Sequence, residues 1–236
     1  MFNLTENSEQ QVKTCLDCDL MSPLFKLLTK SELKKVNDNR FVVNFRAGEN
    51  IRKQGTFLSH VISLNAGLAK LYLEGINKRN IILRVIKPTK FIGGPGMYVD
   101  KRHHFTVTAL VDSCACFIEV EVFKKIIQSN KEFGEGFNKE LSTNTLSTFN
   151  RLINLTQKQM PGRLADVLIY LSDEIFLSRK FKLLLSKNDL AELSGMSKDN
   201  VGRVLNSFKN EGVIKIEDNT IEILKMDSLR VISRIG

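Results

Sequence analysis

The spacing of the apolar residues changes at about residue 122, and this change constrains the fold more than any other feature of the chain. Before it, short runs of alternating apolar and polar residues are separated by turns rich in Gly, Pro and Asn, such as residues 93–96. Many short strands at this spacing are typical of an antiparallel barrel or roll. The predicted strands are residues 41–45, 60–64, 68–73, 80–86, 105–111 and 115–120.

After residue 122 the apolar residues recur at helical spacing, and no proline stands between Pro95 and Pro161. The pattern predicts one helix of about 25 residues that is apolar on two sides. One face carries Leu141, Thr145, Thr148, Leu152 and Leu155, and the other carries Leu146, Phe149 and Ile153. One side can pack on the β-rich part and the other on a second copy, so we predict a homodimer that pairs through the first set. The same pattern is also typical of an ordinary core helix.

The residues Met160-Pro161-Gly162 interrupt this helix, and we place a domain boundary or hinge there. The rest of the chain predicts three helices followed by a hairpin. The expected organisation is a β-rich domain over residues 1–125, a long helix and hinge over 126–160, and a helical domain with a hairpin over 161–236. The predicted fold class is therefore α+β.

Composition and charge indicate which compartment and which kind of partner to expect. No apolar run reaches about eighteen residues and the N-terminus lacks a basic, then apolar, leader, so we expect a cytoplasmic protein without a membrane partner. The net charge of +9 suggests a polyanionic partner. However, residues 161–236 hold twelve Lys and Arg against eleven Asp and Glu, so bulk charge does not locate the binding face.

Residues 185–205 have the pattern of two helices joined by a tight turn. Ser186 can cap the first helix, with Asp189 three residues further on. Gly195 can end that helix in the left-handed conformation that glycine adopts most readily. Ser197 can then cap the second helix.

The second of these helices has an inward and an outward side. Val201, Val204, Leu205 and Phe208 face inward, and Lys198, Asp199, Asn200 and Arg203 face outward. In a helix-turn-helix the second helix enters the major groove of DNA. Arg203 suits O6 and N7 of guanine, and Lys198 suits a guanine or a phosphate. Asp199 could accept from cytosine, and Asn200 could contact adenine or backbone. Ser197 suits a phosphate, and Ser186 completes the predicted DNA-binding set.

A hairpin follows, with strands at 213–217 and 220–224 around an Asp218-Asn219 turn, as in the wing of a winged helix. Two alternatives remain open: a helical hairpin that binds no nucleic acid, and a ligand-binding module that acts through protein partners. An enzyme is not expected. The chain has no G-x-S-x-G, P-loop or H-E-x-x-H motif, and only three histidines.

The run Ser197-Lys198-Asp199-Asn200-Val201-Gly202-Arg203 resembles the S-R-E-T-V-G-R recognition helix of the Crp/Fnr family, named for the cAMP receptor protein and the fumarate–nitrate reduction regulator. Gly48, Gly55, Gly67 and Phe91-Ile92-Gly93 resemble the turns of that family's β-roll, and the similarity extends over about residues 20–235. Lys198 and Asp199 replace Arg and Glu, and Lys is the poorer bidentate reader, so the preferred half-site is expected to differ.

The resemblance implies a cyclic-nucleotide-binding-like jelly roll, a dimerisation helix and a C-terminal winged helix-turn-helix. It also implies double-stranded DNA, a second copy of the chain and RNA polymerase as partners. We therefore expect a transcription regulator that reads a near-palindromic site as a homodimer. A signal in the β-roll would act through the hinge near residues 160–162.

The same resemblance argues against cAMP as the signal. In the family's cAMP binders a Glu for the ribose and an Arg-Ser pair for the cyclic phosphate follow Phe-Ile-Gly. Here those positions hold Gly94, His104 and Phe105, so the charged contacts to the phosphate are lost and Phe105 would crowd it. Gly93, Gly94, His103, His104 and Phe105 are the expected residues of an effector pocket of another kind; the two histidines are also typical of a polar strand edge.

The four cysteines resemble part of the [4Fe–4S] ligand set of the family's oxygen-sensing branch. Cys15 and Cys18 match a C-x-x-C pair, and Cys116 matches the ligand in the β-roll. A further N-terminal cysteine of that branch is missing near Leu24, and Cys114 is an additional thiol. Four thiolates could hold an Fe–S cluster or zinc, which leaves a redox- or gas-sensing regulator as an alternative; small buried thiols without a metal are the other interpretation.

Overall fold

The computed structural model describes residues 21–236, and these residues divide into two compact units. The N-terminal unit comprises the chain up to Glu74 together with Arg84–Leu146, and the C-terminal unit comprises Gly75–Leu83 and Ser147–Gly236. Among the residues described, no helix is long and apolar enough to cross a membrane.

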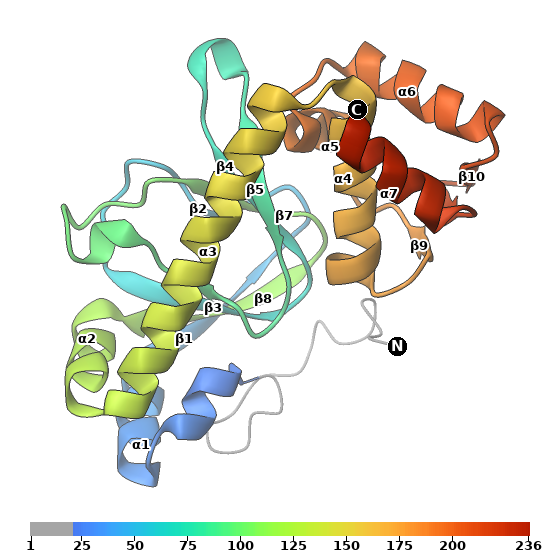
Figure 1. The fold of residues 1–236 in the computed structure, drawn as a ribbon. Helices are drawn as coiled ribbons and strands as arrows, with labels where there is room; N and C mark the ends of the chain where they lie inside the picture. Colours follow the sequence, from blue (N-terminus) through green and yellow to red (C-terminus); the bar gives the residue numbers. More distant parts are fainter. Residues whose placement is uncertain (1–20) are drawn as a thin grey trace. The chain divides into compact units, whose positions relative to one another are not determined.

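Two antiparallel four-stranded sheets form the β-roll (Figure 1). The first has the order β1-β8-β3-β6 and the second the order β2-β7-β4-β5. Their bounds are β1 Arg40–Phe45, β2 Asn50–Arg52, β3 His60–Ala66, β4 Ala69–Leu73, β5 Ile81–Ile86, β6 Phe91–Ile92, β7 Thr106–Ala109 and β8 Ser113–Glu119. The prediction of an N-terminal antiparallel β domain is therefore confirmed, and each expected strand overlaps an observed one.

An aromatic core joins the first sheet to the helices of the N-terminal unit. These elements are the 3-10 helix Pro23–Leu27, α1 Lys30–Asp38, α2 Val120–Ser129 and the first turns of α3 Lys131–Gln157. Phe123 lies at the centre, with ring centroids 5.3 Å from Phe91, 5.4 Å from Phe133 and 5.2 Å from Phe137. Edge-to-face rings at these distances add to the stability gained from burying apolar area. The start of α3 is thereby packed on the roll.

The rest of α3 is largely exposed. The helix has 27 residues, close to the length of about 25 that its apolar spacing predicted, but its buried residues are confined to Phe133, Gly134 and Phe137. Leu146, Phe149, Leu152 and Ile153 are 62%, 56%, 60% and 48% exposed. We call these four residues the α3 stripe. Large apolar groups gathered on one helix mark an interaction surface more often than scattered ones do.

The C-terminal unit is a helix-turn-helix domain with a small sheet. Its elements are α4 Met160–Tyr170, a π-helical turn Leu171–Phe176, β9 Lys180–Lys182, α5 Lys187–Ser194, α6 Lys198–Asn210, β10 Ile214–Glu217, β11 Thr220–Ile223 and α7 Met226–Ile235. Pro161 lies in the first turn of α4, where its missing N–H costs nothing. The sequence did not predict β9 or α7. Strand β9 has three residues, too few to show a period, and it pairs with β11 rather than with a neighbour in sequence.

Candidate nucleic-acid interface and signal pocket

Local hydrogen bonds shape the helix-turn-helix as the sequence predicted. The N–H of Ser186 donates to Oδ2 of Asp189 (2.8 Å), and the N–H of Asp189 donates to Oγ of Ser186 (3.1 Å), which completes a capping box. Gly195 ends α5 with φ of 62°, in the left-handed region. The N–H of Asn200 donates to Oγ of Ser197 (3.2 Å) and begins α6.

Helix α6 separates an apolar inner side from a polar outer side. Val201, Leu205 and Phe208 are 0%, 8% and 2% exposed. Lys198, Asp199 and Arg203 are exposed and Asn200 is half-buried. The Nη2 group of Arg203 donates to Oδ1 of Asn200, so these two side chains are held together. The first two turns of α6 therefore present a group of donors and acceptors of the kind that reads base edges.

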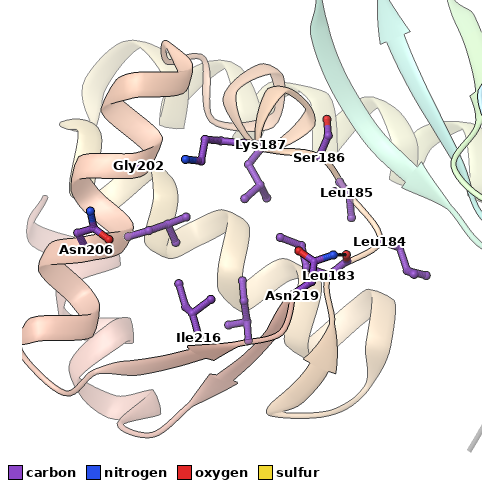
Figure 2. A pocket seen from close by; sticks show the side chains of 12 residues that line it. Leu183, Leu184, Leu185, Ser186, Lys187, Gly202, Asn206, Ile216 and Asn219 are labelled. Atoms are coloured by element: carbon purple, nitrogen blue, oxygen red, sulfur yellow. Dashed lines mark hydrogen bonds between the residues drawn. The ribbon is translucent and has the colours of Figure 1, made fainter.

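A groove of about 550 Å³ runs between the start of α5, helix α6 and the hairpin β10–β11 (Figure 2). Its floor is mostly leucine and isoleucine, and Ser186, Lys187 and Asn206 supply polar groups. Figure 2 shows Lys187 extending from α5 towards Gly202 on α6. Its Nζ would lie 3.5 Å from a Cβ at that position. Sequence analysis missed Lys187 and Asn206, although Asn206 follows Arg203 by three residues and so lies one turn along α6.

Hydrogen bonds from two arginines hold the turn between α5 and α6. Arg151 on α3 donates through Nη2 to the carbonyl oxygen of Leu193, and to that of Glu192 at 3.5 Å. Arg163 on α4 donates through Nη1 to the carbonyl oxygen of Gly195 (3.2 Å). Burial lowers the pKa of Arg151 to about 10, so it is still charged at neutral pH. A cation suits the end of α5, because the last carbonyls of a helix have no partner within that helix. These contacts were not predicted.

The hairpin after α6 also has the expected form. β10 and β11 pair in register, with Glu217 opposite Thr220. Asp218 and Asn219 both have positive φ, 43° and 64°, as the two-residue turns of hairpins require. Asn219 is further fixed because its Nδ2 donates to the carbonyl oxygen of Leu183 (2.8 Å).

The predicted effector residues divide between the interior and the surface of the roll. Phe105 is 7% exposed, and its ring lies 3.1 Å from where a Cβ on Gly94 would be. A Cβ on Gly93 would meet Val61 at 3.6 Å. His103 is 2% exposed, whereas the side chain of His104 is 49% exposed and bonds to Asp100 (3.1 Å). The structure thus brings His103 and Phe105 inside together with Gly94, and leaves His104 outside.

The cysteines are only partly described. Cys114 and Cys116 lie on β8, two residues apart and hence on the same face. Cys116 is 5% exposed in the core, and Nη1 of Arg40 lies 3.9 Å from its sulfur. Cys15 and Cys18 lie outside the described residues. No group of three or more His, Cys, Asp or Glu suited to a metal occurs within residues 21–236, and the four-thiolate site stays a prediction.

The predicted dimerisation residues have different neighbours. Leu141 packs against the aromatic core of the N-terminal unit. Leu155 packs on the turn, with Cδ2 2.7 Å from where a Cβ on Gly195 would be. Thr145 and Thr148 are exposed, and Leu152 lies in the α3 stripe with residues of the second predicted face.

Comparison with known proteins agrees with this description. Residues 42–130 match a model of the cyclic nucleotide-binding domain, and residues 162–232 match a model of the Crp-like helix-turn-helix domain. Together the two matches cover more than half of the chain.

The matches to similar proteins extend over most of the length of this chain. The transcriptional activator protein FnrL of Cereibacter sphaeroides is 22% identical over 87% of this chain and 84% of its own. The transcriptional activator protein anr of Pseudomonas aeruginosa is 22% identical over 94% and 92%. The solved structure of FixK2 from Bradyrhizobium japonicum shares the fold, with a TM-score of 0.76 and 15% identity over 84% of this chain and 98% of that one.

The β-roll and the capped helix-turn-helix thus correspond to the residues that the two domain models match, and the long helix α3 lies between the two matches. The chain belongs to the Crp/Fnr family of transcription regulators, with a cyclic nucleotide-binding-type domain and a DNA-binding, Crp-like helix-turn-helix domain.

Proposed function

We propose that this regulator binds a near-palindromic DNA site as a homodimer and that a ligand other than cAMP, bound in the β-roll, controls it. The observation that carries the proposal is the outer side of α6, where Lys198, Asp199 and Arg203 are exposed above a fully apolar inner side. Arg203 would read a guanine, and Lys198 a guanine or a phosphate. Asp199 and Asn200 would contact cytosine and adenine, and Ser186 and Ser197 would bind phosphates.

The α3 stripe supports pairing with a second copy. Its members present large apolar surface, and Leu146, Phe149 and Ile153 are three and four residues apart, the spacing at which side chains share one helix face. Two copies related by a two-fold axis would bury both stripes together. The predicted residues Thr145, Thr148 and Leu152 would lie in or beside this interface, whereas Leu141 and Leu155 would support it from within each chain.

The interior of the roll supports a signal other than cAMP. The ring of Phe105 lies against Gly94, so a glutamate side chain there would press on it. His104 bonds to Asp100 at the surface, so the charged group expected near a cyclic phosphate faces away. We further propose a cytoplasmic location, RNA polymerase as a partner, no enzymatic activity, and domain limits at about residues 125 and 160.

The test is selection of a DNA site by the full chain, followed by anisotropy titrations at one fixed salt concentration. We expect Arg203→Ala to lower the affinity for the selected site by about 10- to 100-fold, because a bidentate contact contributes roughly 1–3 kcal/mol of discrimination. Lys209→Ala, at the exposed end of α6, is the matched control and should change the affinity little. Unchanged affinity in Arg203→Ala would contradict the readout assignment, and failure to select any site would favour a module that acts through protein partners.

A second candidate, an Fe–S or thiol-based sensor, is favoured by the position of Cys116. Met21 packs against the same core cluster as Cys116, and Cys18 precedes Met21 by only three residues. Cys15, Cys18, Cys114 and Cys116 would hold the cluster, which would supply redox or gas sensitivity. Anaerobic purification with iron, zinc and sulfide analysis tests this. Metal that is lost in Cys116→Ala would support it, and a metal-free dimer would exclude it.

A further inference from the structure

Two basic side chains in the β-roll lack the partners that buried basic groups normally have. His103 is 2% exposed, and within residues 21–236 neither Nδ1 nor Nε2 has a hydrogen-bond partner. Arg52 is half-buried, and its buried Nε also has none in this part of the chain. In folded proteins roughly nine-tenths or more of buried polar groups are paired. These nitrogens therefore call for a partner from outside the part of the chain that the structure describes.

The backbone brings the two residues together. A β-bulge between Asn50 and Arg52 interrupts the pairing of β2 with β7, and bulges of this kind redirect a side chain. The loop after β2 is bound to His103 on both sides. The N–H of Gly55 donates to the carbonyl oxygen of His103 (2.7 Å), and the N–H of His103 donates to that of Thr56 (2.9 Å). The arrangement is thus set by the main chain and not by flexible side chains.

An aromatic ring lies beside each of the two groups. The guanidinium carbon of Arg52 lies 4.7 Å from the ring centroid of Phe117, and the ring of His103 lies 6.4 Å from that of Phe105. Phe41 is 48% exposed and stacks on Phe117 at 5.2 Å. The cluster is therefore apolar around its basic groups and reaches the surface beside Phe41.

The local charge is positive. Burial first, and then the charges of Arg52 and His104, lower the pKa of His103 to about 4. Burial and Arg52 also lower the pKa of His60, which Glu119 opposes. None of the ion pairs among the described residues involves Arg52. A guanidinium over an aromatic ring, with no carboxylate paired to it among residues 21–236, suits an anion.

We propose that Arg52 and His103 bind an organic carboxylate between the rings of Phe105 and Phe117. A guanidinium presents two parallel N–H groups to a carboxylate, and the ring N–H of His103 supplies a third donor. The apolar part of the ligand packs on the two rings. The role of this carboxylate as a signal rests on the proposed function, whereas its binding does not.

The test uses benzoate as the probe and the full chain labelled at the Cε1 carbons of its three histidines. We expect the His103 resonance to shift saturably with benzoate and the exposed His104 to serve as the internal reference. Arg52→Met should lower the affinity for benzoate by about 10- to 100-fold, because the hydrogen bonds from the guanidinium to the carboxylate are lost. Arg46→Met, an exposed arginine at the end of β1, is the matched control and should bind like the wild type.

His103→Phe separates loss of binding from loss of folding, because it keeps a buried ring and removes both unpaired nitrogens. It should fold and should not bind benzoate, as followed by calorimetry. Absence of a saturable shift, equal affinity in Arg52→Met, or equal saturation by chloride or inorganic phosphate would overturn the proposal. DNA binding is measured on the same samples: a chain that binds benzoate and no DNA refutes only the proposed function, and the reverse outcome refutes only the carboxylate site.

Discussion

His103 lies in surroundings far from those of a histidine in water. It is buried beside the ring of Phe105 and close enough to Arg52 for that charge to act on it, and burial first and then this charge lower its pKa to about 4. Its neighbour His104 is exposed and bonds to Asp100. Two adjacent residues of one type therefore have different chemistry, because one lies inside the roll and the other at its surface.

We expect His103→Phe to reduce the acid sensitivity of the fold. In the unfolded chain the imidazole binds a proton below its ordinary pKa of 6.5, whereas in the folded chain it does so only near 4. Between these values the unfolded state holds more protons, so wild-type stability falls as the pH falls, by at most about 3 kcal/mol.

Urea unfolding of both proteins at about pH 7 and about pH 4.5, in carboxylate-free buffer, measures this difference. His104→Gln is the control and should follow the wild type. If wild type and His103→Phe lost stability in parallel, the imidazole would not be buried as described.

At the scale of elements, the end of α3 and the turn of the helix-turn-helix form one packed assembly. Arg151 binds the last carbonyls of α5, and Leu155 packs on Gly195. Gly195 has a positive φ, and a Cβ there would press on the end of the Leu155 side chain, so this turn depends on both its conformation and its contacts. The end of α3 is therefore in direct contact with the turn that precedes α6.

We expect Arg151→Met to destabilise the helix-turn-helix and to weaken DNA binding. The variant keeps the apolar stem but loses hydrogen bonds from a buried cation, which contribute about 1.5–3 kcal/mol. Urea unfolding followed by circular dichroism, together with anisotropy on the selected DNA, measures both effects. Arg179→Met removes an exposed arginine of the same unit and should do neither. Equal stability of the two variants would show that Arg151 does not position the turn.

At the scale of the whole molecule, the α3 stripe is the surface that we propose pairs with a second chain. It places four large apolar side chains, each 48% to 62% exposed, within eight residues of one helix. A dimer that buries it would carry two copies of α6 to successive half-sites about one helical turn apart.

We expect Phe149→Asp to give a monomer, because pairing would bury two like charges in an apolar interface. Light scattering after size exclusion measures the mass. Anisotropy should show that the variant loses much more affinity for DNA with two half-sites than for DNA with one. Only the two-half-site DNA gains from the simultaneous binding of two connected subunits. Val99→Asp, at a more exposed apolar residue of the roll, should remain dimeric. A dimeric Phe149→Asp would place the interface elsewhere.

Local interactions explain what the sequence by itself determined. The capping box at Ser186, the left-handed Gly195, the cap at Ser197 and the inward residues of α6 depend on groups three or four positions apart, so a short segment specifies them. The order of strands and helices could be predicted for the same reason. Apolar residues repeat every two positions in a strand and every 3.6 positions in a helix, and a short segment is enough to show either period. The amino-acid sequence alone was thus enough to identify the candidate DNA-reading residues.

Only the tertiary structure decided which distant groups meet. Arg52 and Phe117 are brought together by a bulge and a sheet-to-sheet packing that no local pattern encodes. Arg151 reaches α5 only because α3, α4 and α5 fold back on one another, and the two apolar faces of α3 divide between core, turn and solvent in a way that depends on those contacts. Contacts far apart in sequence depend on register and packing, which are properties of the assembled fold and not of any one segment.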